Sequence, residues 1–510
     1  MFQVEPLYQR FPALRSGMLV PVLLIALAGV LGLIVIGQAA LATTIILTAI
    51  LTLAILAWPE LGTLVVLFVL FTNAAVIAVK FHDVPSLIGG ALPALLVFPL
   101  ATYIVFRREK IIISPILLPI FLFMAVQVVG ALFSDYKGTA LSNVQTFLLE
   151  GLGLFFMLSN VIRTSATLRR ATWALLIAGA FIGGLSLYQQ ATGTFKNNYW
   201  GFAQPSEAVF NAGQKDAITG AVDQWRLAGQ IGEKNRYAQV MLMLVPLGIF
   251  RMLGERKLWL RGMAGLCTAL SATGAALAFS RGAAVGFVLM LVIMIFMRYI
   301  KLYQVAIIAV GLYILLLALP QYSQRLVSLE SFGSMFSDGT EAVGSTDGAT
   351  LSRLTEMGAA ALVFLDHPLI GVGPGTFPNY YQQYSELIGL RTLNEDRQAH
   401  NLYLSIAAET GIAGLGCFLM VLYVTMTGLA RARNRWMKAD PEIANMATAY
   451  MLSIVTYLTT GLFLHFAFIR YFWMFIALAG AVMYISEQRA REASEAVAEA
   501  PAAGAALATS

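Results

Sequence analysis

Apolar runs long enough to cross a bilayer recur along almost the whole of this 510-residue chain. A spanning helix needs about 20 consecutive, mainly apolar residues. Only 12% of the residues are charged, whereas a soluble chain carries roughly 25%. We therefore expect an all-α, polytopic integral membrane helix bundle with about 14 transmembrane helices, within a range of about 12–14. The runs lie near residues 17–36, 39–57, 61–79, 86–106, 115–133, 143–162, 170–191, 236–252, 260–279, 283–297, 302–319, 402–430, 446–466 and 470–485.

Most of the 33 Lys and Arg residues fall in alternate connections between these runs. This alternation is the pattern of the positive-inside rule, so both termini are expected in the cytoplasm. Two long connections, 192–235 and 320–401, then lie outside. The short outer connections hold only Lys80, Lys137, Arg281 and Arg470.

The chain divides into four predicted parts. Residues 1–191 are N-terminal transmembrane helices, 192–430 hold the two outer loops, and 431–491 are C-terminal transmembrane helices. The first apolar run is longer than the core of a signal peptide, so we expect it to stay as a helix. The 492–510 tail, rich in Ala, Glu and Ser, is expected to be disordered and cytoplasmic. The net charge of +6 is explained by topology, and no nucleic-acid partner is expected.

The first polar motif on the outer side is RLAGQIGEKNRYAQ, residues 226–239. Arg226, Lys234 and Arg236 concentrate positive charge at a helix start, and two glycines let the backbone approach an anion closely. The alternative is ordinary anchoring at the membrane interface.

The second motif is AFSRGAAVGF, residues 278–287. Its Arg281 sits in a very short connection between two strongly apolar helices, where the side chain has little room to reach the interface. We expect Arg281 to point into a polar cavity or to pair with an anion; anchoring is again the alternative.

The third motif is SRLTEMGAAALVFLDHPLIGVGPGTFPNYY, residues 352–381, in the longer outer loop. Leucines at helical spacing (351, 354, 362 and 365) predict an amphipathic helix lying on the membrane, with Arg353 in its first turn. Pro368 and the glycines that follow end this helix. No strand precedes the glycines, so a nucleotide-binding loop is rejected.

The fourth motif is QAHNLYLSIAAETGIAGLG, residues 398–416. His400 stands where the loop meets the membrane, and a neutral imidazole can accept a proton. Glu409, nine residues later, falls on the opposite helix face at 100° per residue, so we expect it to pack in the bundle. Glu150, in the 143–162 run, either relays protons or satisfies a neighbouring helix, and the structural role is favoured.

Other chemistry has no sequence support. We find no paired carboxylates, no His/Cys cluster with metal-ligand spacing and no phosphate-binding loop. No cofactor or metal is therefore expected. Cys267 and Cys417 lie within apolar runs and are interpreted as core residues.

Taken in order, the four motifs resemble the O-antigen ligase/polymerase family of bacterial envelope glycan enzymes. The resemblance covers roughly residues 226–416, and the His-Asn pair with its downstream E-x-G is the most specific part. Residues 1–190 agree only as a hydrophobic bundle. In one departure, Lys234 stands before Asn235 where relatives tend to have proline.

The resemblance implies a GT-C-like fold and a metal-independent, inverting glycosyltransferase of the bacterial inner membrane, with a periplasmic active site. Family members move a glycan from a polyprenyl (undecaprenyl) diphosphate to an acceptor hydroxyl. The matching positions comprise diphosphate-binding arginines, a catalytic base and supporting residues. In that order they are Arg226, Arg281 and Arg353; His400; and Asn235, Asn401 and Glu409.

Three functions stay open at this point. A lipid A–core acceptor makes the protein a ligase, which is slightly favoured, and a lipid-linked glycan acceptor makes it a polymerase; transfer to a protein hydroxyl is a third acceptor choice. A lipid-linked glycan transporter (flippase) belongs to a different class and is expected to place charges near the midplane of the bilayer. An ordered loop helix that carries Arg353 towards His400 indicates the enzyme; a continuous charged cavity through the membrane centre indicates the transporter.

Overall fold

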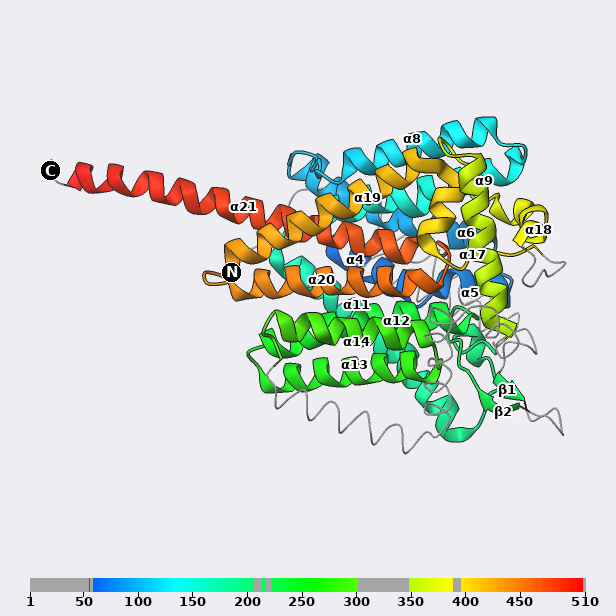
Figure 1. The fold of residues 1–510 in the computed structure, drawn as a ribbon. Helices are drawn as coiled ribbons and strands as arrows, with labels where there is room; N and C mark the ends of the chain where they lie inside the picture. Colours follow the sequence, from blue (N-terminus) through cyan, green and yellow to red (C-terminus); the bar gives the residue numbers. More distant parts are fainter. Residues whose placement is uncertain are drawn as a thin grey trace, which may run out of the picture.

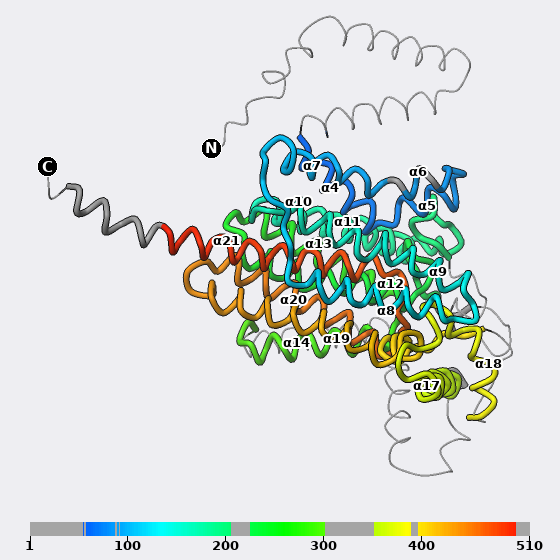
Figure 2. Tube along the Cα trace, turned by 90° about the horizontal axis from the view of Figure 1, so that it is seen from above, coloured from blue at the N-terminus to red at the C-terminus, as the bar shows by residue number. Residues whose placement is uncertain are grey.

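The computed structural model describes residues 55, 58–205, 213–215, 222–300, 348–388 and 396–507. The predicted runs 17–36 and 302–319, and nearly all of 39–57, lie outside these residues. Most of the described helices run along one common long axis and form a bundle (Figure 1). Figure 2 shows the same bundle from above.

The N-terminal part of the bundle comprises short and long helices. They are α4 (Pro59–Phe71), α5 (Ala74–His82), α6 (Ser86–Ala91), the 3₁₀ helix η2 (Leu92–Leu96), α7 (Val97–Ala101), the π-helix η3 (Thr102–Phe106), α8 (Leu117–Phe133), α9 (Lys137–Thr146), the π-helix η4 (Phe147–Gly153), α10 (Leu154–Val161) and α11 (Ser165–Thr192).

The rest of the described chain adds one small hairpin and the helices that carry the four motifs. These elements are the 3₁₀ helix η5 (Tyr199–Gly201), β1 (Gly213–Lys215) and β2 (Val222–Trp225), which pair antiparallel, then α12 (Lys234–Gly254), α13 (Leu258–Leu277), α14 (Arg281–Phe296), α17 (Gly348–Asp366), α18 (Phe377–Ile388), α19 (Leu402–Trp436), α20 (Pro441–Thr460), the 3₁₀ helix η7 (Gly461–Phe463) and α21 (Ile469–Leu507).

Six helices among the described residues are long and apolar enough to cross a membrane: Lys137–Val161, α11, α12, α19, Pro441–Phe463 and Ile469–Glu495. The bent pair of α4 and α5 makes a possible seventh span. Shorter apolar helices are Leu92–Phe106, Leu117–Phe133 and Arg281–Phe296. The predicted membrane helix bundle is confirmed by length and composition, whereas the predicted number of about 14 spans stays a prediction.

The centre of the bundle is formed by α12, α20 and α21. Their apolar spans are 78%, 72% and 89% buried, compared with 33% for α19. These helices carry large aromatic side chains that are fully buried, among them Tyr237, Tyr450 and Trp473. α21 continues as a helix through most of the 492–510 segment, for which composition predicts disorder, and it projects from the bundle (Figure 1). Ala and Glu are strong helix formers, which accounts for the continuation.

The predicted run 61–79 is a bent pair of helices and not one straight helix. α4 and α5 meet at a bend of 58°. Asn73, between them, has a left-handed φ of 60°. Asn tolerates this conformation better than most residues because its short polar side chain bonds locally. The run is apolar on both sides of Asn73, so its overall hydrophobicity gives no indication of the break.

The bend exposes polar backbone that a buried network satisfies. The Asn73 amide donates to the Gln230 carbonyl at 2.9 Å, and Arg470 donates to the Asn73 side-chain oxygen at 2.5 Å. Arg470 also pairs with Glu150 at 3.1 Å. This ion pair supports the structural interpretation of Glu150, and the network ties the N-terminal helices to the 226–239 motif.

A loop cap, residues 348–388, comprises α17, α18 and the segment between them. One face of α17 is buried, and its members recur at helical spacing: Ser352, Thr355, Glu356, Ala359, Ala360 and Val363. The predicted helix is present: small residues form the face buried in the protein, whereas Leu365, one of the leucines predicted to lie on the membrane, is 67% exposed. Small residues form that face because α17 packs closely against α18 and α19.

The loop cap is attached to α19 where that helix breaks. Gly411 has φ 63° and ψ −167°, outside the helical region. Four backbone hydrogen bonds of 2.7 to 3.2 Å join residues 368–373 to residues 408–413 across the break. These bonds satisfy the N–H and C=O groups that the break leaves without helical partners.

A second attachment joins the loop cap to the turn between α8 and α9. The Ser134 hydroxyl donates to the Val372 carbonyl at 2.7 Å, and the Tyr380 hydroxyl donates to Asp135 at 2.8 Å. The loop cap therefore has contacts with both the N-terminal and the C-terminal helices.

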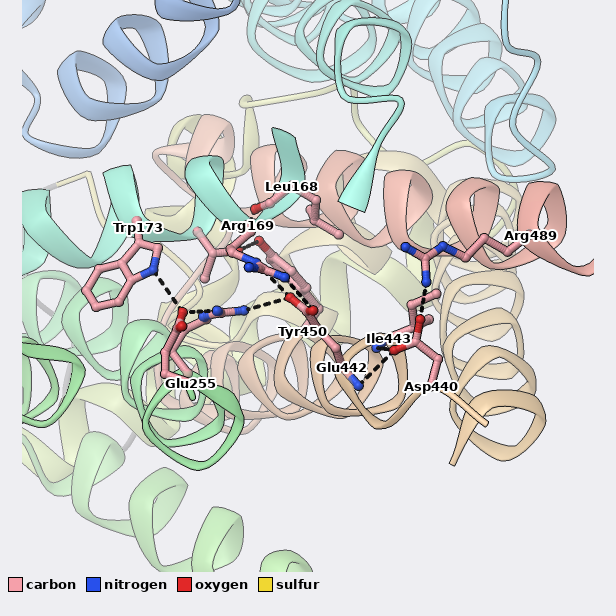
Figure 3. A network of polar contacts seen from close by, with 11 residues as sticks. Leu168, Arg169, Trp173, Glu255, Asp440, Glu442, Ile443, Tyr450 and Arg489 are labelled. Carbon is pink, nitrogen blue, oxygen red and sulfur yellow. Dashed lines mark hydrogen bonds and ion pairs between the residues drawn. The ribbon is translucent and has the colours of Figure 1, made fainter. Parts of the chain in front are cut away.

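At the end of the bundle away from the loop cap, an ion-pair network joins α11, α12 and α20 (Figure 3). Arg251 pairs with Glu255 and lies 3.5 Å from Glu442, which also binds Arg169. Trp173 donates to Glu255 at 3.3 Å. Because these buried charges have partners, they fasten the helix ends together.

Asp440 in this region has two roles that mutations can separate. Its side chain caps α20 by accepting from the N–H groups of Glu442 and Ile443, and it also pairs with Arg489. Asp440→Ala is expected to lower the free energy of unfolding by about 1 kcal/mol, the cost of a lost N-cap. Asp440→Asn keeps a good cap and loses only an exposed pair, worth about 0–1 kcal/mol. Thermal unfolding of both variants in detergent measures this, and equal losses would show that the ion pair matters more than the cap.

Candidate functional site

Three helices begin next to one another at the loop-cap end of the bundle, each at one of the sequence motifs. Glu233 caps α12, Ser280 caps α14 and Asn401 caps α19, each by accepting backbone N–H groups of the first turn. Polar side chains at these positions are what start the helices. Helix N-termini carry partial positive charge and favour anions, so the motifs gather at an anion-favouring surface.

Lys234 does not disturb the start of α12. It occupies the first helical position, directly after the cap Glu233, whose carboxylate accepts from the N–H groups of Asn235 at 3.0 Å and Arg236 at 2.7 Å. Proline suits this position because it needs no hydrogen bond there, and lysine fits for the same reason.

Arg226 joins the first two motifs. Its guanidinium donates to the carbonyls of Ala278 at 2.9 Å and Phe279 at 3.0 Å, and to the side-chain oxygen of Asn235 at 3.2 Å. Arg281 follows two residues after Phe279, as the first residue of α14. The structure thus brings Arg226 and Asn235 into contact and places them against the turn that carries Arg281.

Arg236 connects this group to a second histidine. Its guanidinium, which is buried, donates to the His465 carbonyl at 2.6 Å. The His465 and His400 rings lie 5.9 Å apart between centroids, edge to face. Burial lowers the pKa of His465 well below its usual range, and the nearby Arg236 and His400 add to that effect. His465 is therefore a neutral neighbour of His400 near pH 7.

His400 is held by groups from its own segment and from the loop cap. Its Nδ1 atom lies 3.0 Å from the Gln398 carbonyl and 2.9 Å from Oε2 of Glu356. The backbone at His400 has a left-handed φ of 45°. The His400 side chain is 27% exposed, whereas that of Glu356 is only 1% exposed. The imidazole is therefore partly accessible from outside the protein, whereas the carboxylate is not.

Arg353 lies three residues before Glu356 on α17. Residues three apart share a helix face, so α17 presents Arg353 and Glu356 towards the same side. Because Glu356 reaches His400, Arg353 is brought to the same end of the bundle as the other candidate residues. Arg397 also approaches Glu356, with 3.8 Å between NH1 and Oε1.

Asn401 and Glu409 hold the chain in place around His400. The Asn401 side chain accepts from the N–H groups of Tyr403 and Leu404 and donates to the Leu462 carbonyl at 3.2 Å. Glu409 accepts backbone N–H groups of Gly375 and Phe377 in the loop cap. As expected from its spacing, Glu409 does not contact His400 in these interactions; it fastens the glycine-rich turn.

The arrangement combines cations with a proton acceptor. Arginine side chains recognise phosphate groups through paired hydrogen bonds, and three helix N-termini add to the attraction for an anion. A partly exposed imidazole can take a proton from a hydroxyl. Among the residues that the structure describes, no group of three or more His, Cys, Asp or Glu side chains is placed to hold a metal ion.

Sequence reasoning missed Glu356 and His465. Glu356 lies inside the third motif, at helical spacing from Arg353, and that spacing was the available signal. For His465, the available signal was the rarity of histidine, since the chain contains only four. Its pairing with His400 depends on how α20 and α21 pack, which no local pattern encodes.

The fold and the site together define a membrane helix bundle with a cationic, histidine-containing site at one end. Residues 266–419 match the family model described as O-antigen ligase. The match includes Arg281, Arg353 and His400, and it supports the resemblance seen in the motifs: this part of the chain is similar to the O-antigen ligase family. Members of that family are glycosyltransferase-like ligases and polymerases. No curated protein matches the chain.

Proposed function

We propose that this protein transfers a glycan from a polyprenyl (undecaprenyl) diphosphate to an acceptor hydroxyl, as an O-antigen ligase acting on lipid A–core. The observation that carries the proposal is the contact of separate motifs at one end of the bundle: Arg226 against the turn before Arg281, and His400 against the helix that bears Arg353. The protein lies in the bacterial inner membrane, with both termini cytoplasmic and this end facing the periplasm.

The donor binds through its diphosphate. Transfer of the glycan breaks the bond between the anomeric carbon and the diphosphate oxygen, so negative charge develops on the leaving group. Arg226, Arg281 and Arg353, together with the N-termini of α12 and α14, stabilise that charge without requiring a metal. Stabilisation that grows as the bond breaks accelerates the reaction, because it favours the transition state over bound substrate.

His400 acts as the base. It takes the proton of the acceptor hydroxyl as the oxygen attacks the anomeric carbon from the side opposite the diphosphate. A single displacement of this kind inverts the anomeric configuration. Histidine is the side chain that most often serves as a general base, and the partial exposure of His400 leaves room for an acceptor.

The ordered loop cap supports an enzyme over a lipid-linked glycan transporter. α17 carries Arg353 and brings Glu356 to within 2.9 Å of His400. The charged residues of the motifs meet at one end of the bundle, whereas a transporter is expected to bind its cargo near the midplane.

The choice of acceptor is tested with purified protein in detergent. The protein is mixed with a polyprenyl-diphosphate glycan and offered two acceptors separately, lipid A–core and the lipid-linked glycan itself. Product on lipid A–core establishes the ligase, and lengthened lipid-linked glycan establishes the polymerase. Donor binding with neither product contradicts both and indicates the transporter.

Arg281→Ala is expected to lower the rate of transfer by about 10–100-fold, the loss of one charge-assisted hydrogen bond of about 1.5–3 kcal/mol. Arg281→Lys keeps the charge but loses the planar fork, so it is expected to restore only part of the rate. Initial rates at saturating acceptor measure both. Arg256→Ala, an exposed position at the far end of the bundle, serves as the control. A normal rate in Arg281→Ala excludes this arginine from diphosphate binding.

A further inference from the structure

Glu356 is a buried carboxylate to which the reaction proposed above assigns no role. It lies on the buried face of α17, where its side chain is 1% exposed. Removing a carboxylate from water is costly unless charges or hydrogen bonds compensate. Most of its neighbours on that face, such as Ala359, Ala360 and Val363, are apolar and offer no compensation.

The compensation comes from the segment that ends at His400. Oε2 of Glu356 lies 2.9 Å from Nδ1 of His400, and Oε1 lies 3.8 Å from NH1 of Arg397. Glu356 is thus placed between a histidine and an arginine, both outside its own helix.

The neighbours of Nδ1 determine which nitrogen of His400 carries the hydrogen. One neighbour is the Gln398 carbonyl oxygen at 3.0 Å and the other is the Glu356 carboxylate. Both are acceptors, so contact with them is favourable only if Nδ1 carries a hydrogen. In the neutral ring Nε2 then has the free lone pair, which is the form a base requires.

We propose that Glu356 is a positioning residue for His400: it fixes the Nδ1–H tautomer, orients the ring and stabilises the positive charge that His400 acquires during transfer. This inference rests on the proposed function and extends it. The loop cap is then part of the active site, because docking of α17 delivers the carboxylate to the base.

The proton balance of the step is complete. The acceptor O–H bond breaks and its proton moves to Nε2, while the acceptor oxygen bonds to the anomeric carbon and the diphosphate leaves with the electron pair. His400 is left with hydrogens on both nitrogens and one positive charge. The Glu356 carboxylate, on the Nδ1 side, balances that charge until the proton passes to solvent.

The other charged groups around His400 are compatible with this role. His465, from the α20–α21 connection, is held neutral by its burial and by Arg236 of α12, so it does not repel a protonated His400. Arg397, from the segment before α19, lies 3.8 Å from the other oxygen of Glu356, so its positive charge faces the carboxylate.

The test is the pH dependence of transfer in Glu356→Gln, which keeps the size of the side chain and removes its charge. We expect kcat to fall about 10–100-fold, less than the loss of about 10²–10⁴-fold expected when the base itself is removed. We also expect the acidic limb of the kcat/KM profile to move to lower pH, because a carboxylate near the ring favours its protonated form. Donor binding is expected to be unchanged. Glu356→Asp keeps the charge and is expected to retain the wild-type limb at a reduced rate.

Glu386→Gln, on the exposed face of α18, is the matched control and is expected to behave as the wild type. Thermal unfolding shows whether each variant is folded; if Glu356→Gln is not, Glu356→Asn, which also removes the charge, takes its place, and an unshifted limb there overturns the inference. Suppose that Glu356→Gln is folded and transfers glycan more slowly, but the acidic limb of its kcat/KM profile does not move. The carboxylate then has only a structural role, and the inference is overturned. An unchanged rate also overturns it, while a loss of transfer in His400→Gln still supports the proposed function. Absence of transfer in the wild type contradicts the proposed function itself.

Discussion

Replacing His400 with Gln lowers the rate of glycan transfer by about 10²–10⁴-fold and leaves donor binding nearly unchanged. Glutamine preserves the approximate size and polarity of the side chain but cannot accept a proton at neutral pH. The side chains proposed to bind the diphosphate, Arg226, Arg281 and Arg353, remain, so the donor is expected to bind still. Single-turnover transfer, measured with labelled donor at saturating acceptor, separates the chemical step from product release.

The matched control is His367→Gln. His367 also belongs to the chain's four histidines and lies exposed in the loop cap, where its ring faces Tyr380. This variant is expected to transfer glycan at the wild-type rate. If His400→Gln keeps single-turnover transfer intact, the assignment of His400 as base is wrong, whatever the acceptor turns out to be.

Replacing Gly411 with Ala destabilises the protein by about 3 kcal/mol or more and detaches the loop cap from α19. The φ and ψ of 63° and −167° belong to a region that is essentially restricted to glycine and costs about 1–3 kcal/mol for other residues. In addition, an added Cβ would lie 2.3 Å from the carbonyl carbon and oxygen of Leu369. The neighbour is backbone, so it cannot move aside without breaking the hydrogen bonds that join 368–373 to α19.

Gly416, five residues later on the same helix, provides the control. A Cβ there meets nothing within 4 Å, so Gly416→Ala is expected to be neutral or slightly stabilising, since alanine has the higher helix propensity. Thermal unfolding in detergent, combined with protease cleavage within residues 348–388, measures both stability and attachment of the cap. Equal stability of the two variants would mean that α19 tolerates a straight path at Gly411.

The residues that bear charge could be predicted from the sequence, but their contacts could not. Arg226 and Arg281 stand out because arginine is costly beside apolar helices. Their proximity depends on the Arg226 side chain reaching carbonyls of Ala278 and Phe279, which are 52 and 53 residues away in the chain. No periodic pattern carries that information.

The bend in the 61–79 run could not be predicted from its hydrophobicity. The run is apolar enough for one span, yet Asn73 turns the chain by adopting a left-handed conformation. In α17, the spacing of the leucines predicted the helix, whereas the face that packs against the protein carries Ala359 and Ala360, which are fully buried. That face depends on packing against other helices, which the spacing of leucines does not encode.

The carboxylate that approaches His400 belongs to a residue that is distant from it in the sequence. Glu409 is near in sequence, and its angular position correctly placed it away from His400. Glu356 precedes His400 by more than forty residues and reaches it only because the loop cap docks on α19. The residues near His400 in the sequence therefore give no indication of this contact.

The position of the loop cap depends on two attachments, and these come from different parts of the chain. Ser134 and Asp135, which hold the cap on one side, belong to the N-terminal helices, where no recognisable motif lies. Substitutions there can tilt or shift the cap while Arg281 and His400 stay as they are. Evolution can thus alter which acceptor fits beside an unchanged reaction centre. The residues that change would lie in N-terminal helices that a comparison of sequences shows only as ordinary hydrophobic membrane helices.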